Sequence, residues 1–311
     1  MKTNKEKDLV NMTLKRHQRE KFKITGNDII GYLFLVPAIF CLWYFTVRPM
    51  IMGTYMSFFN MRGYKLTEFC GLDNYIRILN DPMFIKTLWN TIKYVLWSLV
   101  IGFGIPILLA IILNELTHMR STIRFWIYLP SATPMVAVTM LWYFMYYPNA
   151  GGLLNICISK LGIDPYVWLQ DSRMTIIFII ISMTWHGMGS TMMYYFAALQ
   201  SVNHDLYEAA TIDGAGVIRR ARVVTLPKLY PIIILFLARQ IIGVFSVMQE
   251  PMQMTGGGPN GASMSLGLQI YEYAFVNYRP QFALALGVIM FLILMVATCF
   301  YFILDRKVEE M

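Results

Sequence analysis

The sequence predicts an all-α membrane protein, and its composition and the length of its apolar runs are the observations that predict it. Of its 311 residues, 57% are hydrophobic and 14% are charged, whereas soluble domains are about 45–50% apolar and about 25% charged. The mean hydropathy of +0.52 points the same way. The apolar residues fall in runs long enough to cross a bilayer, which takes roughly 20 residues for each helix.

We expect one transmembrane helix in each long apolar run, which gives six. The runs lie at about residues 29–48, 92–114, 125–146, 174–198, 230–252 and 282–304. No large soluble domain is expected, and the longest outer segments, about 53–90 and 147–173, are expected to form caps with short amphipathic pieces. The chain then consists of a cytoplasmic basic tail (1–28), a transmembrane domain (29–304) and a cytoplasmic C-terminus (305–311).

The basic residues orient this bundle. With six spans, both termini and the connections after spans 2 and 4 fall on one side of the membrane. That side carries Lys2, Lys5, Lys7, Lys15, Arg16, Arg19, Lys21, Lys23, Arg120, Arg124, Arg219, Arg220, Arg222, Lys228, Arg306 and Lys307. The opposite loops carry Arg62, Lys65, Arg77, Lys86, Lys160, Arg173 and Arg279. Because basic residues accumulate on the cytoplasmic side of membrane proteins, we expect both termini inside. The basic residues of the cytoplasmic side account for the net charge of +8, so we do not expect a nucleic-acid partner.

The residue pattern predicts neither a metal site nor a catalytic site. The four cysteines, Cys41, Cys70, Cys157 and Cys299, form no CxxC pair. Cys70 and Cys157 fall in outer loops, where a disulfide between them stays open as an alternative. No set of His, Cys, Asp and Glu has the spacing of metal ligands, and no nucleophile is paired with a base. We therefore do not expect an enzyme.

The cytoplasmic connection at residues 199–229 predicts a short helix. It contains the run DLYEAATIDGAG. Asp205 is expected to cap the helix, because Glu208 follows at the spacing of a capping box. Gly214 is expected to end it by adopting a positive φ angle.

This predicted helix has a small apolar face. Leu206, Ala209 and Ala210 share one side at helical spacing. Such a face suits packing into a groove of another protein. A capped surface helix that merely connects two spans accounts for the same pattern. The helix pattern alone does not decide between a docking helix and a connecting helix.

The motif residues of this loop resemble a known family. Glu208-Ala209-Ala210, Asp213-Gly214-Ala215 and Leu226-Pro227 resemble the EAA loop of permease subunits of ABC importers. The segments GGLLN (151–155), FAALQSVNHDLYEAA (196–210) and MTGGGPNGASMSLGLQIYEYAF (254–275) are similar to the carbohydrate-uptake branch, of the maltose and multiple-sugar type. The resemblance covers about residues 30–305. Two positions depart from the family pattern: Ala221 stands where an aromatic residue is common, and Asn203 stands where a proline is common.

This resemblance implies a type I ABC importer permease fold and a function. In that family the loop is a coupling helix that docks on an ATPase subunit. The residues implied in coupling here are Glu208, Ala209, Ala210, Asp213, Gly214, Ala215 and Pro227. The implied partners are a second permease subunit in a heterodimer, two ATPase subunits and an extracytoplasmic sugar-binding protein, in a bacterial cytoplasmic membrane. The implied cargo is a sugar or oligosaccharide.

ATP and magnesium are expected on the partner subunits, with no cofactor in this chain. The glycine-rich run GGGPNGAS has no lysine before its serine. A phosphate-binding loop needs that lysine and leads into a helix.

A polar stripe in span 5 marks a candidate substrate path. Arg239, Gly243, Ser246, Glu250 and Gln253 recur at steps of four and three, which aligns them on one helix face. Charged residues inside a membrane usually face a bundle interior or a wet cavity. The stripe therefore lines the sugar path or the facing permease, or it is a hydrogen-bonding seam between helices. Pro251 is expected to bend or break the helix nearby.

Further path candidates are Gln249 in span 5 and residues of spans 3 and 4. Trp185 and His186 in span 4 have the chemistry to stack on a sugar ring and to bond a sugar hydroxyl. Trp142 and Tyr143 at the outer end of span 3 are path candidates or interfacial aromatics. The nearby Gly187 and Gly189 favour close helix packing instead.

Two other functions remain as alternatives. An ion-coupled secondary transporter is expected to show an inverted repeat with paired broken helices, and neither is visible in this sequence. Within the ABC class, a glycerol-phosphate-type ester or a polyol is the alternative cargo. An anionic cargo would favour several basic residues in the cavity, and only Arg239 lies deep in a span, which favours a neutral sugar.

Overall fold

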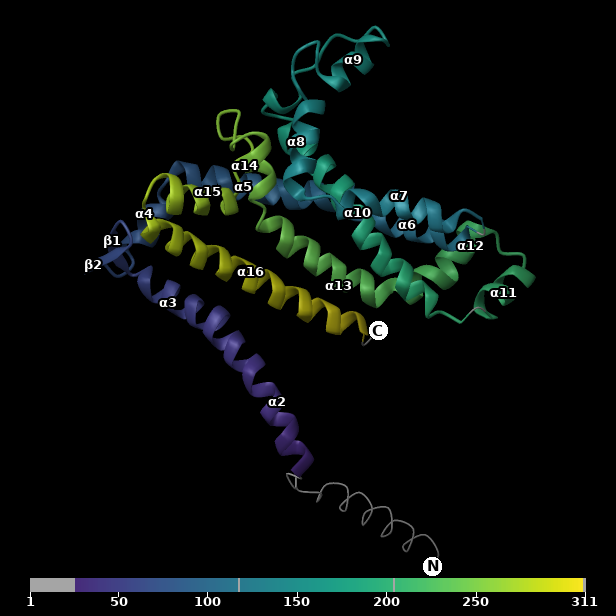
Figure 1. Ribbon diagram of the computed structural model, residues 1–311, viewed down its shortest axis with the longest axis horizontal. Coiled ribbons are helices and arrows are strands. Elements are labelled where there is room, and N and C mark those ends of the chain that lie inside the picture. The colour runs from purple at the N-terminus through teal and green to yellow at the C-terminus, as the bar shows by residue number, and fades with distance from the viewer. Residues whose placement is uncertain (1–25, 117, 204, 310–311) are drawn as a thin grey trace, which may run out of the picture. The chain divides into compact units, whose positions relative to one another are not determined.

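The computed structural model describes residues 26–116, 118–203 and 205–309. The predicted basic tail up to residue 25 lies outside the described residues. The elements in chain order are α2 (Gly26–Leu42), η1 (Trp43–Val47), α3 (Arg48–Met56), β1 (Phe59–Arg62), β2 (Lys65–Phe69), α4 (Asp73–Leu79), α5 (Pro82–Trp97), η2 (Ser98–Gly102), α6 (Gly104–Glu115), α7 (Arg120–Ala132), α8 (Met135–Met145), α9 (Leu153–Ser159), η3 (Trp168–Gln170), α10 (Thr175–Gln200), α11 (Asp205–Ile212), α12 (Val217–Arg220), η4 (Ala221–Thr225), α13 (Leu226–Phe245), α14 (Gln249–Met254), α15 (Leu266–Tyr271), η5 (Glu272–Val276) and α16 (Pro280–Glu309) (Figure 1).

The predicted all-α membrane class is confirmed. Within the part of the chain that the structure describes, five helical stretches are long and apolar enough to cross a membrane: Gly31–Met56, Pro82–Glu115, Thr175–Gln200, Val217–Phe245 and Pro280–Cys299. The pair α7 and α8 supplies a sixth span if it is counted as one helix bent by 94°. The sequence did not predict the antiparallel hairpin β1–β2, which pairs Phe59 with Phe69 and lies in an outer segment expected to form a cap with short amphipathic pieces.

The chain divides into two compact units, residues 1–55 and 56–311. In the first unit, the described residues form one apolar helical rod, in which a π-helical turn (η1) joins α2 to α3. Neither η1 nor α3 has a buried residue. The Arg48 guanidinium lies 4.9 Å from the centre of the Tyr44 ring. A rod that is both apolar and exposed is suited to contact with lipid or with another chain.

Helix α10 lies at the centre of the second unit. Its outer half packs with α5, α8 and the Trp168 turn, in a cluster that contains Tyr94 and Ile179. Its other half packs with α6, α7 and α13 around Met192 and Tyr195. A third cluster joins α4, α5, α15 and α16 around Leu286. Figure 1 shows α11 and α12 at one end of this unit, and the β1–β2 hairpin with α4 and α15 at the other.

Several spans differ from their predicted bounds, and span 1 runs to Met56 rather than to about residue 48. The helix of span 2 begins at Pro82 rather than near residue 92, because Asp81 caps it by accepting a hydrogen bond from the Met83 amide at 2.9 Å. Span 5 ends at Phe245 rather than near residue 252. The polar residues Asn90 and Thr91 in the added turns of α5 are buried. Hydropathy misses such turns because their polar side chains are satisfied inside the protein.

The outer segment 147–173 is organised by one buried amide. The Asn155 Nδ2 group donates to the carbonyl oxygens of Tyr147, Asn149 and Tyr166 at 3.0–3.2 Å. Its Oδ1 atom accepts from the Tyr166 amide at 3.0 Å and from Trp168 Nε1 at 2.7 Å. These hydrogen bonds of one amide hold the two ends of the cap together.

The two outer cysteines are not paired. Cys70 and Cys157 are both free thiols. Cys70 Sγ donates instead to the Phe58 carbonyl at 3.4 Å.

In the outer segment 147–173, the Tyr166 hydroxyl and the Arg173 amide donate to Asp171, and these bonds lower the pKa of its carboxyl group.

Gly189 sets the spacing between α7 and α10. A Cβ atom at this position would lie 2.3 Å from the Ile127 carbonyl oxygen and 2.8 Å from the Tyr128 Cα atom. Both are backbone atoms, so the two helices approach too closely for any side chain. Gly187, two positions earlier, has open space around it. The predicted close packing is therefore confirmed at Gly189 and not at Gly187.

This difference gives a matched pair of substitutions. We expect Gly189→Ala to push α7 away from α10 and to lower the melting temperature and yield of the detergent-purified protein, since overpacking typically costs about 1–3 kcal/mol. Gly187→Ala, on the same helix, should leave both unchanged or slightly raised, because alanine is the better helix former. Equal melting temperatures for the two variants would contradict the close approach.

Candidate functional site

The loop helix α11 forms at the predicted place with a different start. It begins at Asp205, and the Asn203 side chain accepts the Asp205 amide at 3.1 Å and donates to the Asp205 carboxylate at 3.0 Å. Asp205 is thus the first helical residue and not the cap that the sequence predicted. Asp205 and Glu208 both lie in the first turn, where the helix dipole favours negative charge. Asn203, where the family pattern commonly has proline, holds the helix start.

The end of α11 is a glycine-terminated stop, as predicted. Gly214 has φ of +76°. Its amide donates to the Thr211 carbonyl at 3.0 Å, and the Ala215 amide donates to the Ala210 carbonyl at 2.9 Å. This pair of bonds is the Schellman arrangement, which requires a left-handed residue at the position of Gly214.

The predicted coupling residues lie on and beside this helix. Glu208, Ala209, Asp213, Gly214 and Pro227 are exposed, and Ala210 and Ala215 are half-buried. Pro227 lies in the first turn of α13, where its missing amide costs no helical bond. Their role in coupling stays a prediction.

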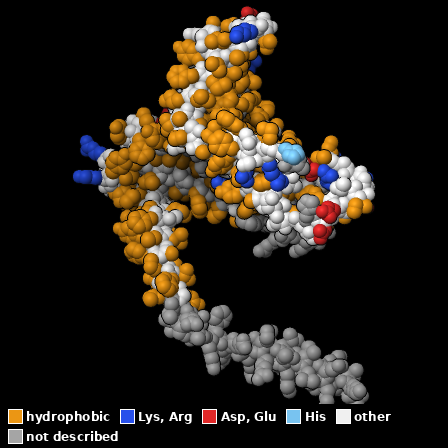
Figure 2. Space-filling model, turned by 45° about the vertical axis from the view of Figure 1, so that its right-hand side comes forward, with side chains coloured by type: hydrophobic (Ala, Val, Ile, Leu, Met, Phe, Trp, Pro, Cys, Tyr) orange, Lys and Arg blue, Asp and Glu red, His pale blue; other side chains and the backbone are white. Residues whose placement is uncertain are grey.

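The loop also presents apolar side chains that the sequence analysis missed. Ile212 is 86% exposed and Ile218 is 78% exposed, and Val217 and Val223 are exposed as well. A surface depression next to α12 is lined by Gly216, Val217, Ile218, Arg219, Arg222 and Val223. Figure 2 shows blue and red side chains gathered near this end of the second unit, whereas hydrophobic side chains cover most of the rest of the visible face. A group of exposed apolar side chains rimmed by charged residues is a feature of protein-binding surfaces.

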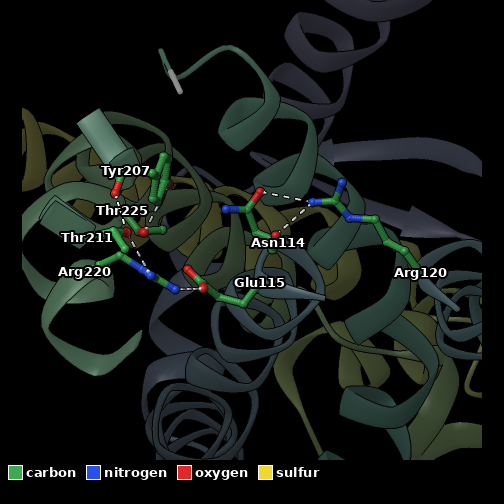
Figure 3. Close-up of polar contacts among 7 residues, drawn as sticks. All are labelled: Asn114, Glu115, Arg120, Tyr207, Thr211, Arg220 and Thr225. Atoms are coloured by element: carbon green, nitrogen blue, oxygen red, sulfur yellow. Dashed lines mark hydrogen bonds and ion pairs between the residues drawn. The ribbon is translucent and has the colours of Figure 1, made fainter. Parts of the chain in front are cut away.

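Polar contacts tie the loop to the ends of other spans (Figure 3). Arg220 on α12 forms an ion pair with Glu115 at the end of α6. Its Nη1 atom also donates to Thr211 Oγ1 on α11 at 3.1 Å. The Tyr207 and Thr225 hydroxyl groups lie 3.2 Å apart. A cavity of about 820 Å³ lies between the loop and the ends of α6, α7 and α10.

The polar stripe of span 5 does not lie on one helix. The helix ends at Phe245, and Glu250 and Gln253 belong to the separate helix α14. In a continuous helix the Val247 carbonyl would need the amide of residue 251, which is proline and has none. Ser265 Oγ donates to this carbonyl instead, at 2.5 Å. The predicted single face is therefore wrong beyond Phe245, although the predicted break near Pro251 is confirmed.

The break brings three candidate residues to one cavity. Ser246, Gln249 and Glu250 line a cavity of about 400 Å³ together with Met135, Met183, Gly243, Val247 and Met248. Glu250 is 8% exposed. Gln253 lies on the same short helix and accepts a hydrogen bond from Thr139 Oγ1 on α8. Arg239 does not line this cavity; its guanidinium lies 5.5 Å from the centre of the Phe236 ring.

The aromatic candidates lie elsewhere. The rings of Trp142 and Trp185 meet edge to face at 5.8 Å, and Trp142 packs against the cluster around α10. Tyr143 is 40% exposed and lines a different cavity, of about 260 Å³, with Pro259. None of these three side chains shares the Glu250 cavity.

His186 braces the bend between α7 and α8. Its Nε2 atom lies 3.3 Å from the Thr133 carbonyl, which can only accept, so Nε2 carries the proton in this contact. Ser131 Oγ donates to the His186 carbonyl at 2.5 Å and accepts from the Ser190 amide at 3.1 Å. The contact with Thr133 uses a ring nitrogen of His186, the side chain that the sequence analysis offered to a sugar hydroxyl.

A bundle with one bent span, an open cavity that contains Ser246, Gln249 and Glu250, and a projecting loop helix fits a membrane-embedded transport subunit. The family model described as "Binding-protein-dependent transport system inner membrane component" matches residues 102–310. The chain belongs to this family. The predicted resemblance to ABC importer permeases is thereby confirmed, and membership of a transport family confirms that the chain is a permease and not an enzyme.

Relatives and solved structures agree with this assignment. The chain is 33% identical to the lactose transport system permease protein of Rhizobium radiobacter, over 90% of this chain and 96% of the relative. It is 32% identical to a probable ABC transporter permease protein of Bacillus subtilis, over 87% and 94%. A bacterial alginate ABC transporter, solved in complex with an alginate-bound periplasmic protein, contains a chain that is 27% identical, with a TM-score of 0.81 over 93% of this chain and 98% of that one. The predicted type I permease fold is confirmed by this match.

The brace at the bend is open to a direct test. We expect His186→Ala to lower the melting temperature of the purified protein, because the half-buried Thr133 carbonyl loses its partner, which costs up to about 1–3 kcal/mol. His186→Gln keeps a donor near the same place and should recover part of the loss. Tyr143→Phe, on the neighbouring helix, is the control and should melt like the unmodified protein. A stable alanine variant would show that the bend needs no brace.

Proposed function

We propose that this chain is one of two different permease subunits in a bacterial carbohydrate importer of the ABC class. The observation that carries the proposal is the exposed loop helix α11, with its glycine stop and its apolar neighbours Ile212 and Ile218. An exposed apolar surface among charged residues supports the docking of another protein there. The loop's EAA motif and the transport family of the chain support an ATPase subunit as that protein.

The proposed complex contains a second permease, two ATPase subunits and an extracytoplasmic sugar-binding protein, in the cytoplasmic membrane. The alginate transporter, which was solved with a periplasmic binding protein, supports such an arrangement. ATP and magnesium are proposed to bind to the ATPase subunits, with no cofactor in this chain.

The proposed mechanism is a rigid-body switch. Closure of the ATPase subunits moves α11, and the packed spans carry this motion to the central cavity. The cavity then changes between inward-facing and outward-facing states, which is a two-state rearrangement of packed bodies.

The proposed cargo is a neutral sugar or oligosaccharide. The relatives include permease proteins for lactose and for arabinooligosaccharides. Among the described residues that line the central cavity, Glu250 is the charged one. A carboxylate disfavours a phosphate ester, and Arg239 lies outside this cavity, so the glycerol-phosphate alternative lacks a basic partner here. A polyol stays as the second candidate, because it offers the same hydroxyl groups as a sugar.

Affinity purification of the tagged chain in mild detergent tests the proposed complex, and one substitution sharpens it. We expect Gly214→Val to reduce co-purification of an ATPase subunit, because a side chain at positive φ costs about 1–2 kcal/mol and unwinds the end of α11. Gly162→Val is the matched control: Gly162 also has φ of +76° with open space around it, but it lies in the outer cap. Recovery of ATPase subunits with Gly214→Val as fully as with Gly162→Val would contradict docking through α11.

Uptake by the reconstituted complex tests the path residues. We expect Ser246→Ala and Glu250→Ala each to reduce uptake of the sugar retained by the co-purified binding protein by about tenfold, since a lost hydrogen bond of about 1.4 kcal/mol changes an equilibrium by that factor. Ser201→Ala is the control. Like the Ser246 hydroxyl, the Ser201 hydroxyl donates to a backbone carbonyl of its own helix, that of Ala198 at 2.7 Å, but it lies at the loop end of α10. Unchanged uptake and selectivity in both cavity variants would leave the cavity without a role in transport.

A further inference from the structure

The chain itself connects the loop to only two spans. Helix α11 follows α10 after a short turn, and α12, η4 and α13 run into one another, so that Val217–Phe245 is one long helical stretch. Motion of the loop therefore passes through the backbone to α10 and α13. Helix α6 ends at Glu115 and has no such connection. Helix α6 packs on α10, and a direct link from α6 to the loop itself has to be made by side chains.

Arg220 supplies this link by contacting three elements. It is the last residue of α12, its Nη2 atom pairs with Glu115 at the end of α6, and its Nη1 atom donates to Thr211 on α11. The side chains of Arg220 and Glu115 are 20% and 18% exposed. Figure 3 shows the guanidinium pointing from the loop toward Glu115, with Thr211 on its other side. We call Glu115, Thr211 and Arg220 the polar clamp.

The Glu115 end of the clamp lies on a braced helix end. Arg120 Nε donates to the Leu113 carbonyl at 2.9 Å, and its Nη2 atom donates to the Asn114 carbonyl at 3.0 Å. Gln200 Nε2, at the end of α10, donates to Asn114 Oδ1 at 3.3 Å. These bonds satisfy carbonyl groups that the last turn of a helix leaves open. The end of α6 is therefore fixed to α7 and α10, and a displacement of Glu115 moves α6 as a body.

The loop end of the clamp is also fixed. The Tyr207 hydroxyl on α11 lies 3.2 Å from the hydroxyl of the buried Thr225 in η4. Together with the contact between Thr211 and Arg220, it joins α11 to the stretch that follows it. The loop helices are thus joined to one another, and the Arg220 side chain links them directly to Glu115 at the end of α6, in addition to the packing of α6 on α10.

We propose that Arg220 and Glu115 are positioning residues for transport: they transmit the displacement of the loop to α6, so that α6 moves together with α13. This proposal rests on the proposed function, because the displacement originates in ATPase subunits docked on α11. Its chemistry is a charge-assisted hydrogen bond between guanidinium and carboxylate, which is stronger and more directional than a neutral one.

Two fluorescent reporters distinguish a loss of motion transmitted from the loop to α6 from a general loss of protein stability. In a chain whose four native cysteines are replaced by serine, a single cysteine is placed at Ile112 on α6 or at Leu235 on α13, both of which are exposed. Each is labelled with an environment-sensitive dye in the purified complex, and the spectral shift caused by ATP with vanadate is measured. The clamp is opened by Glu115→Gln or by Arg220→Gln. Lys228→Gln, which removes an exposed positive charge at the start of α13, is the matched control.

In either clamp variant we expect the ATP-dependent shift at residue 112 to fall by about fivefold or more, the lower range of measured coupling between sites. The shift at residue 235 and the rate of ATP hydrolysis should persist, and Lys228→Gln should change neither reporter. The double exchange Glu115→Arg with Arg220→Glu should recover most of the shift at residue 112.

Three results would overturn the proposal. A full shift at residue 112 in both single variants would show that α6 moves without the clamp. Loss of both shifts, unrecovered by the double exchange, would show a general structural role. Absence of any ATPase subunit from the complex of the unmodified chain would overturn the proposed function itself, and with it the role of the clamp.

Discussion

Inside a bilayer, a backbone carbonyl or amide that leaves its helix has to find a partner within the protein, because no water is available there. In the second unit, helical spans are interrupted between α7 and α8 and between α13 and α14, and both breaks free backbone groups that need such a partner. At the first interruption His186 contacts the Thr133 carbonyl. At the second, Ser265 donates to the Val247 carbonyl. In both cases a side chain from a different helix satisfies the freed carbonyl, so each interruption also binds helices together.

The two interruptions account for the position of the polar cavity. Met135 is the first residue of α8, after the bend, and Ser246 to Glu250 span the second break; both groups line the same cavity. The hydrogen bond between Thr139 and Gln253 joins the short helices that follow the two breaks. A regular apolar helix offers a solute nothing polar, whereas a broken one exposes backbone and polar side chains at the same depth. The fold thus creates a polar surface where its helices are discontinuous.

The sequence predicted most of the helices and the stop of α11, because hydropathy and glycine chemistry are local. Gly214 is an example: its positive φ follows from its neighbours along the chain. The sequence did not predict that span 5 ends at Phe245, because the partner of Val247 is Ser265, on a later helix. His186 has the chemistry of a sugar ligand and of a structural brace, and only the proximity of Thr133 shows where its nitrogen points. The pairing of Glu115 with Arg220 was equally invisible, since the two residues lie far apart in the sequence.

The partial exposure of the ion pair in the polar clamp suits a contact that has to persist through a change of state. A fully buried ion pair is costly to open, because each charge is left without water or a partner. A fully exposed pair contributes little, since solvent and salt screen it. The pair between Glu115 and Arg220 lies between these limits, with each side chain about a fifth exposed. The pair is shielded enough from solvent to hold α6 to the loop. It is also accessible enough to water that it can break and form again if the helices slide during the transport cycle. A hydrophobic contact of the same area would lack this directionality, because apolar surfaces slide past one another without a preferred register.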